Sequence, residues 1–336
     1  MKKRMLSLLM LCFILICLGA CGVDSKEISA SETTSLIEVE DLEPLTIRAI
    51  RSSSAPSGGA FVKKTWVNAN PWTEDTDLSA LPVFVYTWER AENNTDEDYA
   101  AMETFLVEAA EFFGFKTTQY EIKNMISQLC AELDGMWIYV DDEMKTRIYF
   151  EQGVSLPSKY NLSKEASYEE KREAAEYIRK KYKKIINMED PQINVRDGEN
   201  NNISLFEGAD NLADRIVNYN FKRTDFYIDK DGLITSIIIY RPDLSQKVGD
   251  YPIISADEAK ELLGEGHYYG ADNFPGVEWV KHVELVYDTG SSHNVLMPYY
   301  SFYAGSLYYV PAIDPQYITN MPVNGRYPDL WDGLNN

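Results

Sequence analysis

The feature that most constrains the fold of this chain is a repeated order in which one helix-like stretch is followed by strand-like stretches. Helix starts are marked by Thr95 and by two Ser-x-x-Glu capping boxes, at Ser167 with Glu170 and at Ser255 with Glu258. Apolar residues recur at helical spacing after these starts, and runs rich in Val, Ile, Tyr and Phe follow. The pattern predicts an α+β fold of two or three units, each a helix packed on antiparallel sheet.

Individual strands can be assigned from the same runs. Residues 81–88 predict a strand, and residues 117–123 predict a shorter one. Three hairpins are expected, with turns or loops at 141–143, at 230–232, where Asp-Gly favours a tight turn, and at 288–294. The flanking strands are predicted at 136–140 and 146–152, at 215–229 and 233–242, and at 277–287 and 295–303, with a further strand at 307–313.

These elements and the local composition divide the chain into five parts. The expected parts are a signal peptide (1–20), a flexible acidic tether (21–60), a first α+β unit (61–160), a second (161–250) and a third with a C-terminal tail (251–336). The tether is rich in Ser, Thr and Glu and has no apolar period from which a core could be built.

The N-terminus has the features of an export signal. Lys2, Lys3 and Arg4 precede an apolar run that is shorter than the roughly 20 residues needed to span a bilayer. The run ends in Leu-Gly-Ala before Cys21, a tract that resembles the lipobox of bacterial lipoproteins. This resemblance implies that Cys21 is lipidated and that the protein is held at the extracytoplasmic face of the cell membrane, which we expect to be that of a Gram-positive bacterium.

Cysteine content and charge set further limits. Cleavage before Cys21 would leave Cys130 as the one thiol that is not lipidated, so no internal disulfide is expected. Residues 125–137 around it predict an apolar helical face, on which Cys130 would be a small buried hydrophobe. The chain has 32 basic and 53 acidic residues, a net charge of -21, which disfavours nucleic acid as a partner.

The C-terminal half carries a resemblance to a known family. The segments "DFYIDKDGLITSIIIYRPDL", "IISADEAKELL", "VELVY", "LMPYYSFYAG" and "YYVPAID" resemble PepSY-like domains and the membrane-anchored extracytoplasmic regulators of Gram-positive wall-sensing histidine kinases. The resemblance covers about residues 225–314. It implies a PepSY-like unit that binds or inhibits a partner, expected to be a membrane sensor kinase or an envelope protein. Those regulators usually have an N-terminal transmembrane helix, whereas a lipid anchor is expected here.

One tract suggests catalysis. Residues 288–292 read Asp-Thr-Gly-Ser-Ser, the sequence that carries the catalytic aspartate of pepsin-like proteases. Such a site needs two aspartates that share a proton, and the other Asp-Gly pairs of the chain lack the intervening Thr or Ser. Asp288 is therefore interpreted as part of a hairpin loop, with an aspartic-type hydrolase kept as the alternative.

Motifs for other chemistry are weak. His267, His282 and His293 lie in separate segments without metal-ligand spacing, and neither a phosphate-binding loop nor a Gly-x-Ser-x-Gly motif is present. An EF-hand centred on Gly232 would place tyrosine and isoleucine where carboxylates are required. We expect no cofactor, no metal site and no catalytic residue.

The aromatic residues of the third unit suggest a binding surface. Trp279, Tyr299 and Tyr303 would stack on sugars or grip a peptide if all three were exposed, and would fill the core if buried. The sequence thus favours a lipid-anchored, non-catalytic binding or regulatory protein of the cell envelope. The alternative within this class is a peptide- or glycan-binding lipoprotein that uses an aromatic sheet face.

Overall fold

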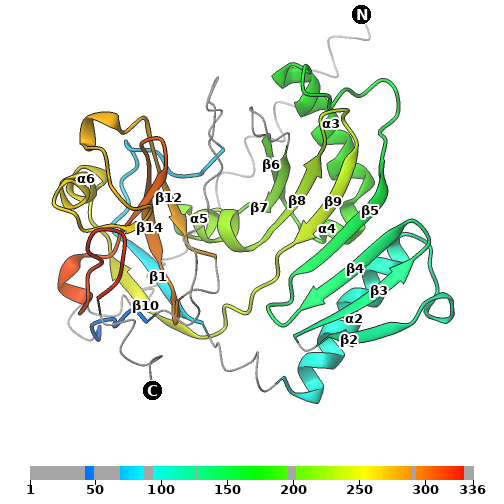
Figure 1. Cartoon of the computed structure of the whole chain (residues 1–336), viewed down its shortest axis with the longest axis horizontal. Coiled ribbons are helices and arrows are strands. Elements are labelled where there is room, and N and C mark those ends of the chain that lie inside the picture. The colour runs from blue at the N-terminus through cyan, green and yellow to red at the C-terminus, as the bar shows by residue number, and fades with distance from the viewer. Residues whose placement is uncertain are drawn as a thin grey trace, which may run out of the picture. The chain divides into compact units, whose positions relative to one another are not determined.

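Three antiparallel sheets organise the part of the chain that the computed structural model describes, namely residues 42–48, 69–86, 94–125, 127–195, 202–289 and 293–328. The largest sheet has eight strands in the order β2-β3-β4-β5-β9-β8-β7-β6 (Figure 1). Its strands are β2 (Ile122–Met125), β3 (Gln128–Leu133), β4 (Met136–Asp141), β5 (Thr146–Val154), β6 (Pro191–Val195), β7 (Ile203–Glu207), β8 (Arg223–Ile228) and β9 (Ile234–Ile239).

One face of this sheet is covered by helices. α2 (Asp96–Phe112) packs on β3 and β4, and α3 (Tyr168–Lys181) packs on β6 and continues into the short α4 (Lys183–Ile186). The helices lie behind the sheet in the view of Figure 1. Alternate residues of the strands meet the helices and are buried, as Ile148, Ile237 and Phe226 illustrate.

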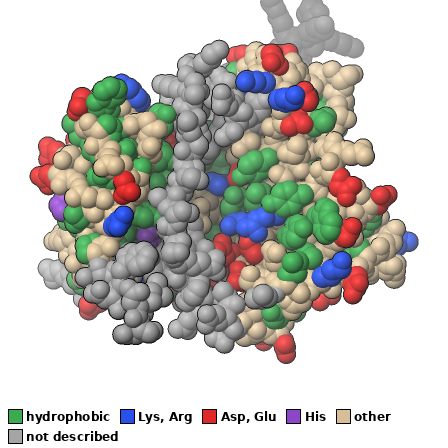
Figure 2. Space-filling view, in the orientation of Figure 1, with side chains coloured by type: hydrophobic (Ala, Val, Ile, Leu, Met, Phe, Trp, Pro, Cys, Tyr) green, Lys and Arg blue, Asp and Glu red, His purple; other side chains and the backbone are tan. Residues whose placement is uncertain are grey.

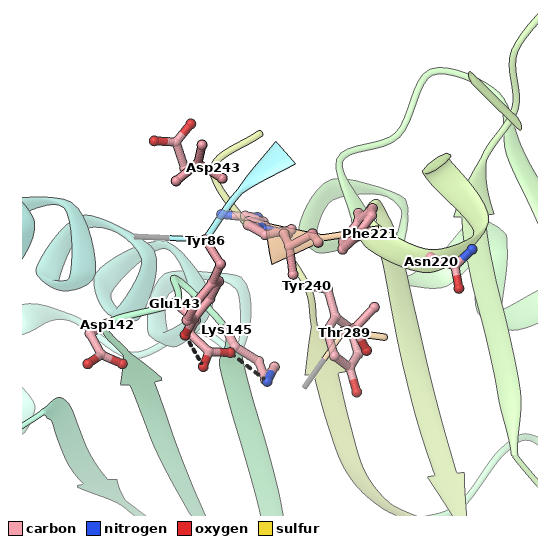
Figure 3. A pocket seen from close by; sticks show the side chains of 13 residues that line it. Tyr86, Asp142, Glu143, Lys145, Asn220, Phe221, Tyr240, Asp243 and Thr289 are labelled. Carbon is pink, nitrogen blue, oxygen red and sulfur yellow. Dashed lines mark hydrogen bonds and ion pairs between the residues drawn. The ribbon is translucent and has the colours of Figure 1, made fainter. Parts of the chain in front are cut away.

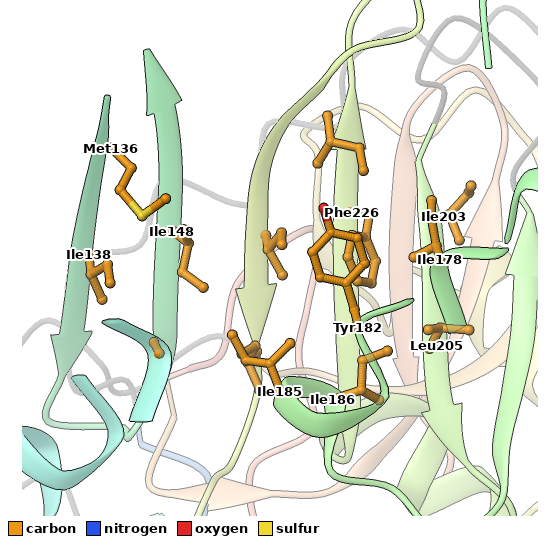
Figure 4. Packing of buried hydrophobic residues seen from close by; sticks show 14 of the residues in the cluster. Met136, Ile138, Ile148, Ile178, Tyr182, Ile185, Ile186, Ile203, Leu205 and Phe226 are labelled. Atoms are coloured by element: carbon orange, nitrogen blue, oxygen red, sulfur yellow. The ribbon is translucent and has the colours of Figure 1, made fainter. Parts of the chain in front are cut away.

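A single core joins the helices to the whole width of the sheet. Ile138 and Ile148 come from one side, Phe226 and Ile203 from the other, and Tyr182 packs its ring 5.2 Å from that of Phe226 (Figure 4). All five side chains are at most 1% exposed. The burial of apolar surface therefore couples strands from both halves of the eight-stranded sheet.

The two smaller sheets are built mainly from the C-terminal part of the chain. One has the order β10-β1-β13 and the other β11-β15-β14-β12. Their strands are β1 (Ala80–Val85), β10 (Lys247–Pro252), β11 (Tyr269–Gly270), β12 (His282–Tyr287), β13 (Val295–Leu296), β14 (Pro298–Tyr303) and β15 (Leu307–Pro311). α6 (Ala256–Gly264) packs against β15, and the 3-10 turn η4 (Val277–Trp279) lies next to α6.

The helix α5 (Leu212–Phe221) touches both groups of sheets. It packs against β7 and β8 of the large sheet, and against β1 and β12 of the smaller ones. Its residues Ile216, Val217 and Phe221 enter the second core, while Tyr219 packs edge-on against Phe206 of β7 with ring centroids 5.1 Å apart. α5 thus covers the β6–β7 end of the sheet face that lacks the other helices.

The predicted fold class is confirmed, because helices pack on antiparallel sheets throughout the described residues. Thr95, Ser167 and Ser255 cap α2, α3 and α6, each with a reciprocal capping box. The hairpins β4–β5, β8–β9 and β12–β14 form with the expected pairing. Gly232 takes a φ of +84° in the second of these turns, as a tight turn requires. The likeness to PepSY domains stays a prediction.

Four element assignments were wrong in whole or in part. Residues 117–119 and 277–279, expected at the starts of strands, form 3-10 turns. The described residues of 125–137 hold no helix: Gln128–Leu133 and Met136–Asp141 form the β3–β4 hairpin, with Gly135 at a φ of +76° in its turn. Short apolar runs do not distinguish a buried strand from a helix, and the Asp-Gly turn decides here. Residues 215–221, expected as strand, belong to α5, because their apolar side chains lie on one helical face against the second core.

The expected units do not correspond to separate sheets. Strands from 61–160 and from 161–250 share the eight-stranded sheet, through the β5–β9 pair. β1, expected in the first unit, pairs instead with β10 and β13. Strand pairing is set by long-range burial, which hydrophobic patterning along the chain does not specify. The expected signal peptide and most of the tether lie outside the described residues. Within 42–48, however, Leu45 and Ile47 are buried in a core with the smaller sheets, so this part of the expected flexible tether is packed.

Candidate functional site

The uncovered face of the eight-stranded sheet is the candidate functional site. Side chains alternate along each strand, so the residues between the core positions point to the face opposite α2 and α3. On β4 and β5 these residues are Trp137, Tyr139, Arg147 and Tyr149. In Figure 2, which views this face, hydrophobic side chains gather around a few basic ones.

Three of these side chains form what we call the aromatic row, consisting of Trp137, Tyr139 and Tyr149. The rings of Trp137 and Tyr139 are nearly parallel, with centroids 6.3 Å apart and an interplanar angle of 14°. Trp137 is the register partner of Tyr149, whose ring meets that of Tyr139 edge-on at 5.9 Å. Tyr149 is 42% exposed, and the other two are partly exposed. Amphipathic rings in this state are common at binding surfaces.

An ion pair fixes one side of the aromatic row. Arg147 is the register partner of Tyr139, and its guanidinium lies 2.7 Å from the carboxylate of Asp141. The other carboxylate oxygen of Asp141 accepts a hydrogen bond of 2.9 Å from the backbone N–H of Lys145. These two contacts hold Arg147 over the sheet, and the partial burial of the pair reduces its screening by solvent.

A concavity of about 460 Å³ adjoins the other side of the row, where Glu132 is the register partner of Trp137. Its charged lining is one lysine, Lys123, and four carboxylates, from Glu121, Glu132, Asp134 and Glu151. Burial raises the pKa of Tyr139 above its ordinary value, and its neighbours Cys130, Tyr149 and Glu132, in decreasing order, raise it further. Of the carboxylates in this concavity, Glu132 therefore makes a small contribution at the aromatic row. We refer to this concavity as the acidic end.

A second, smaller cavity of about 60 Å³ lies where β1 and α5 approach the β4–β5 turn (Figure 3). Tyr86 donates a hydrogen bond of 2.9 Å to Glu143, and the ammonium of Lys145 lies 3.1 Å from the same carboxylate and 5.3 Å from the ring centre of Tyr240. This volume admits a few water molecules and is below the size of usual ligand pockets. The open sheet face is therefore the better candidate for a ligand site than this cavity.

The expected surface of Trp279, Tyr299 and Tyr303 is not assembled. Trp279 is 56% exposed, whereas Tyr299 is 1% exposed and its hydroxyl hydrogen-bonds that of Tyr327 at 2.9 Å. Tyr303 is half-buried at the end of β14. Burial raises the pKa of Tyr299 well above its ordinary value, as expected for a ring inside the core. Only Trp279 of the three is freely accessible, so they form no shared surface.

The aromatic row was missed although a signal for it was present. The alternation in "MWIYV" and in "TRIYF" already places Trp137 with Tyr139, and Arg147 with Tyr149, on one side of each strand. The sequence leaves open which side of the strands faces the helices. Because the helices pack on the other side, these rings lie at the surface and not in the core.

Asp288 lies beside a buried imidazole. Its carboxylate is 3.3 Å from Nδ1 of His293, and His293 is 2% exposed. The imidazole also meets the rings of Tyr269 and Tyr327 edge-on, at 5.0 and 5.2 Å. This contact gives Asp288 a structural role in the described part of the chain. Residues 290–292 of the tract lie outside the described residues.

The remaining candidates have structural surroundings. His267 contacts the carbonyl of Pro322 at 3.3 Å, and His282 contacts Glu284 at 2.9 Å. Cys130 is buried beside Met125. Within the described ranges, no group of three or more His, Cys, Asp or Glu side chains is arranged to hold a metal ion. None of the helices described there combines the length and hydrophobicity needed to cross a bilayer. Cys21, the expected lipidation site, lies outside those ranges.

Comparisons with known proteins add little. No family model matches the chain, and no curated protein matches it. Among solved structures, an uncharacterized protein from Eubacterium rectale matches over 70% of this chain and 84% of its own, with 14% sequence identity and a TM-score of 0.34. A likeness at this level does not support an argument about fold or function.

Proposed function

We propose that this protein is a lipid-anchored, extracytoplasmic binding protein of the bacterial cell envelope, and that its ligand binds on the aromatic row. The observation that carries the proposal is that Trp137, Tyr139 and Tyr149 stand together on a sheet face that α2 and α3 leave uncovered. Large aromatic rings are usually placed in a core, so three adjacent rings on an open face suggest a surface kept for binding.

The anchor is proposed from the sequence. The short apolar leader and the lipobox-like tract before Cys21 support lipidation, and the acidic segment that follows supports a spacer. Labelling with a palmitate precursor should mark the wild-type protein and fail to mark Cys21→Ala. Equal labelling of both proteins would contradict an anchor at this residue.

Non-catalytic binding is supported by the chemistry of the face. On the side of the row away from the acidic end, Arg147 is paired with Asp141, an arrangement that suits positioning more than proton transfer. A regulatory role, as the resemblance to kinase regulators implies, would use the same kind of surface for a protein partner. Crosslinking in membranes distinguishes ligand binding from regulation, because a sensor kinase would be recovered only if the protein is a regulator.

The binding proposal is tested by affinity electrophoresis in gels that contain soluble polysaccharides of the cell envelope. The double variant Trp137→Ala/Tyr149→Ala should lose the retardation that the wild type shows. A matched control is Trp279→Ala/Tyr303→Ala, which removes one Trp and one Tyr from the expected but unassembled surface. If the control lost retardation and the first variant kept it, the binding surface would lie in the third unit and our proposal would be wrong.

A further inference from the structure

We infer that the ligand of the aromatic row is a polymer of amino sugars that carry free, protonated amines. This inference rests on the proposed function and adds the chemical class of the ligand. It follows from two adjoining features of the same face, the aromatic row and the acidic end. Neither feature alone specifies a ligand, but a chain of cationic sugar rings suits both.

The backbone of the sheet favours a sugar over a peptide. Peptides that bind sheets usually add a strand at an edge, where unpaired N–H and C=O groups are available. The aromatic row lies on β4 and β5, which are interior strands whose backbones pair with β3 and β9 on their outer sides. At the aromatic row, the face therefore offers side chains only. Flat rings at its surface can stack on the apolar faces of sugar rings without any backbone pairing.

Charge complementarity favours amines on those sugars. One lysine faces four carboxylates in the acidic end, and the Nζ of Lys123 lies 4.0 Å from Glu132 with both side chains more than half exposed. The lining keeps a net negative charge next to Trp137, the register partner of Glu132. Ammonium groups are attracted to carboxylates and also to the faces of aromatic rings. A neutral sugar would gain only the stacking contact.

The size of the acidic end and the charge of the whole chain agree with this ligand class. The concavity of about 460 Å³ lies within the usual range of ligand pockets, so it can accept a sugar unit while the next units extend along the row. The net charge of -21 attracts cationic polymers from a distance and repels phosphate-bearing ones.

The test compares two ligands that differ only in their amines. Isothermal titration calorimetry is carried out with fully deacetylated β-1,4-linked glucosamine oligomers and with N-acetylated oligomers of the same length. The pH is mildly acidic, so that the amines are protonated while most carboxylates stay ionised. We expect the deacetylated oligomer to bind about tenfold more tightly at low ionic strength, and this preference to shrink as salt screens the exposed charges. Equal binding of both oligomers would overturn the inference and leave the proposed function standing.

Variants separate the contribution of charge at the acidic end from that of stacking on the aromatic row. Glu132→Gln/Glu151→Gln should remove most of the preference for the deacetylated oligomer, because it should lower the affinity for that oligomer much more than the affinity for the acetylated one. The control Glu169→Gln/Glu173→Gln changes the charge equally on exposed positions of α3, on the other side of the sheet, and should keep the preference. Trp137→Ala should weaken both oligomers. Loss of the preference in the α3 control would show a general charge effect and overturn the inference.

A cationic peptide supplies the remaining comparison. Oligolysine of matched charge should compete weakly with the deacetylated oligomer, because it lacks rings that stack on the aromatic row. Competition at equal concentration would show that the face responds to charge alone, and the assignment to a sugar would be wrong. Failure of wild-type protein to be retarded by any polysaccharide, in the electrophoresis described above, would instead count against the proposed function itself.

Discussion

The replacement Phe226→Ala provides a direct test of whether the eight-stranded sheet is one cooperative unit. Phe226 is fully buried on β8, is the register partner of Ile203 and Ile237, and packs its ring 5.2 Å from that of Tyr182. Loss of the ring removes its burial energy and leaves a cavity that surrounding strands fill only in part. Such replacements cost about 3–5 kcal/mol, so the variant should unfold at a clearly lower urea concentration.

Hydrogen exchange measured by mass spectrometry shows which strands feel this loss. Because β5 pairs with β9 and all eight strands share one core, amides of β4 and β5 should lose protection together with those of β8. Tyr149→Ala is the control, since it removes an aromatic ring that is 42% exposed on the opposite face and should change stability by less than about 1 kcal/mol. Unchanged protection of β4 and β5 in Phe226→Ala would refute the single sheet and favour separate units divided near residue 160.

Three further predictions concern the smaller sheets. Asp288→Asn should destabilise the protein by about 1–3 kcal/mol in urea titrations, because it removes the charge that faces the buried His293. Unchanged stability would contradict this pairing, and pepstatin-sensitive casein cleavage that is present in the wild type and absent in Asp288→Asn would favour the hydrolase alternative. The pKa of Glu258 is lowered, first by the hydrogen bond from the backbone of Ser255 and then by its hydroxyl. The contribution of Glu258 to the free energy of unfolding is therefore present above its unfolded pKa and is lost as pH falls through its folded pKa. In urea titrations, Glu258→Gln should be less stable than the wild type at neutral pH and equally stable in acid. A stability difference that persists in acid would contradict this. Burial, followed by the charge of Glu258, raises the pKa of Tyr300 to about 12. Stability from this group is present below its unfolded pKa and is lost as pH rises through about 12. Because Tyr182 and Tyr309 also titrate near 12, the late rise in tyrosinate absorbance should persist in Tyr300→Phe but be smaller by the absorbance of one tyrosine; an equal rise in both proteins would contradict this.

The candidate site shows which structural features can be predicted from the alternation of residues along a strand. Period-two alternation correctly paired "MWIYV" with "TRIYF" as a hairpin, and that hairpin carries the aromatic row. The same reasoning left open whether Tyr299 is on the surface or in the core, and it is 1% exposed. Both predictions rest on the fact that alternate residues share a face, but alternation is symmetric and cannot tell the covered face from the free one.

The sequence by itself determined the α+β class, the capped starts of α2, α3 and α6, and the turn at Gly232, because these depend on side-chain and backbone preferences within a few residues. Only the tertiary structure decided that β5 pairs with β9, that β1 joins β10 and β13, and that α5 replaces a strand. Those outcomes depend on which apolar surfaces meet across long stretches of chain. The same burial leaves Trp137, Tyr139 and Tyr149 on the open face of the sheet, where no pattern within a single strand could have placed them.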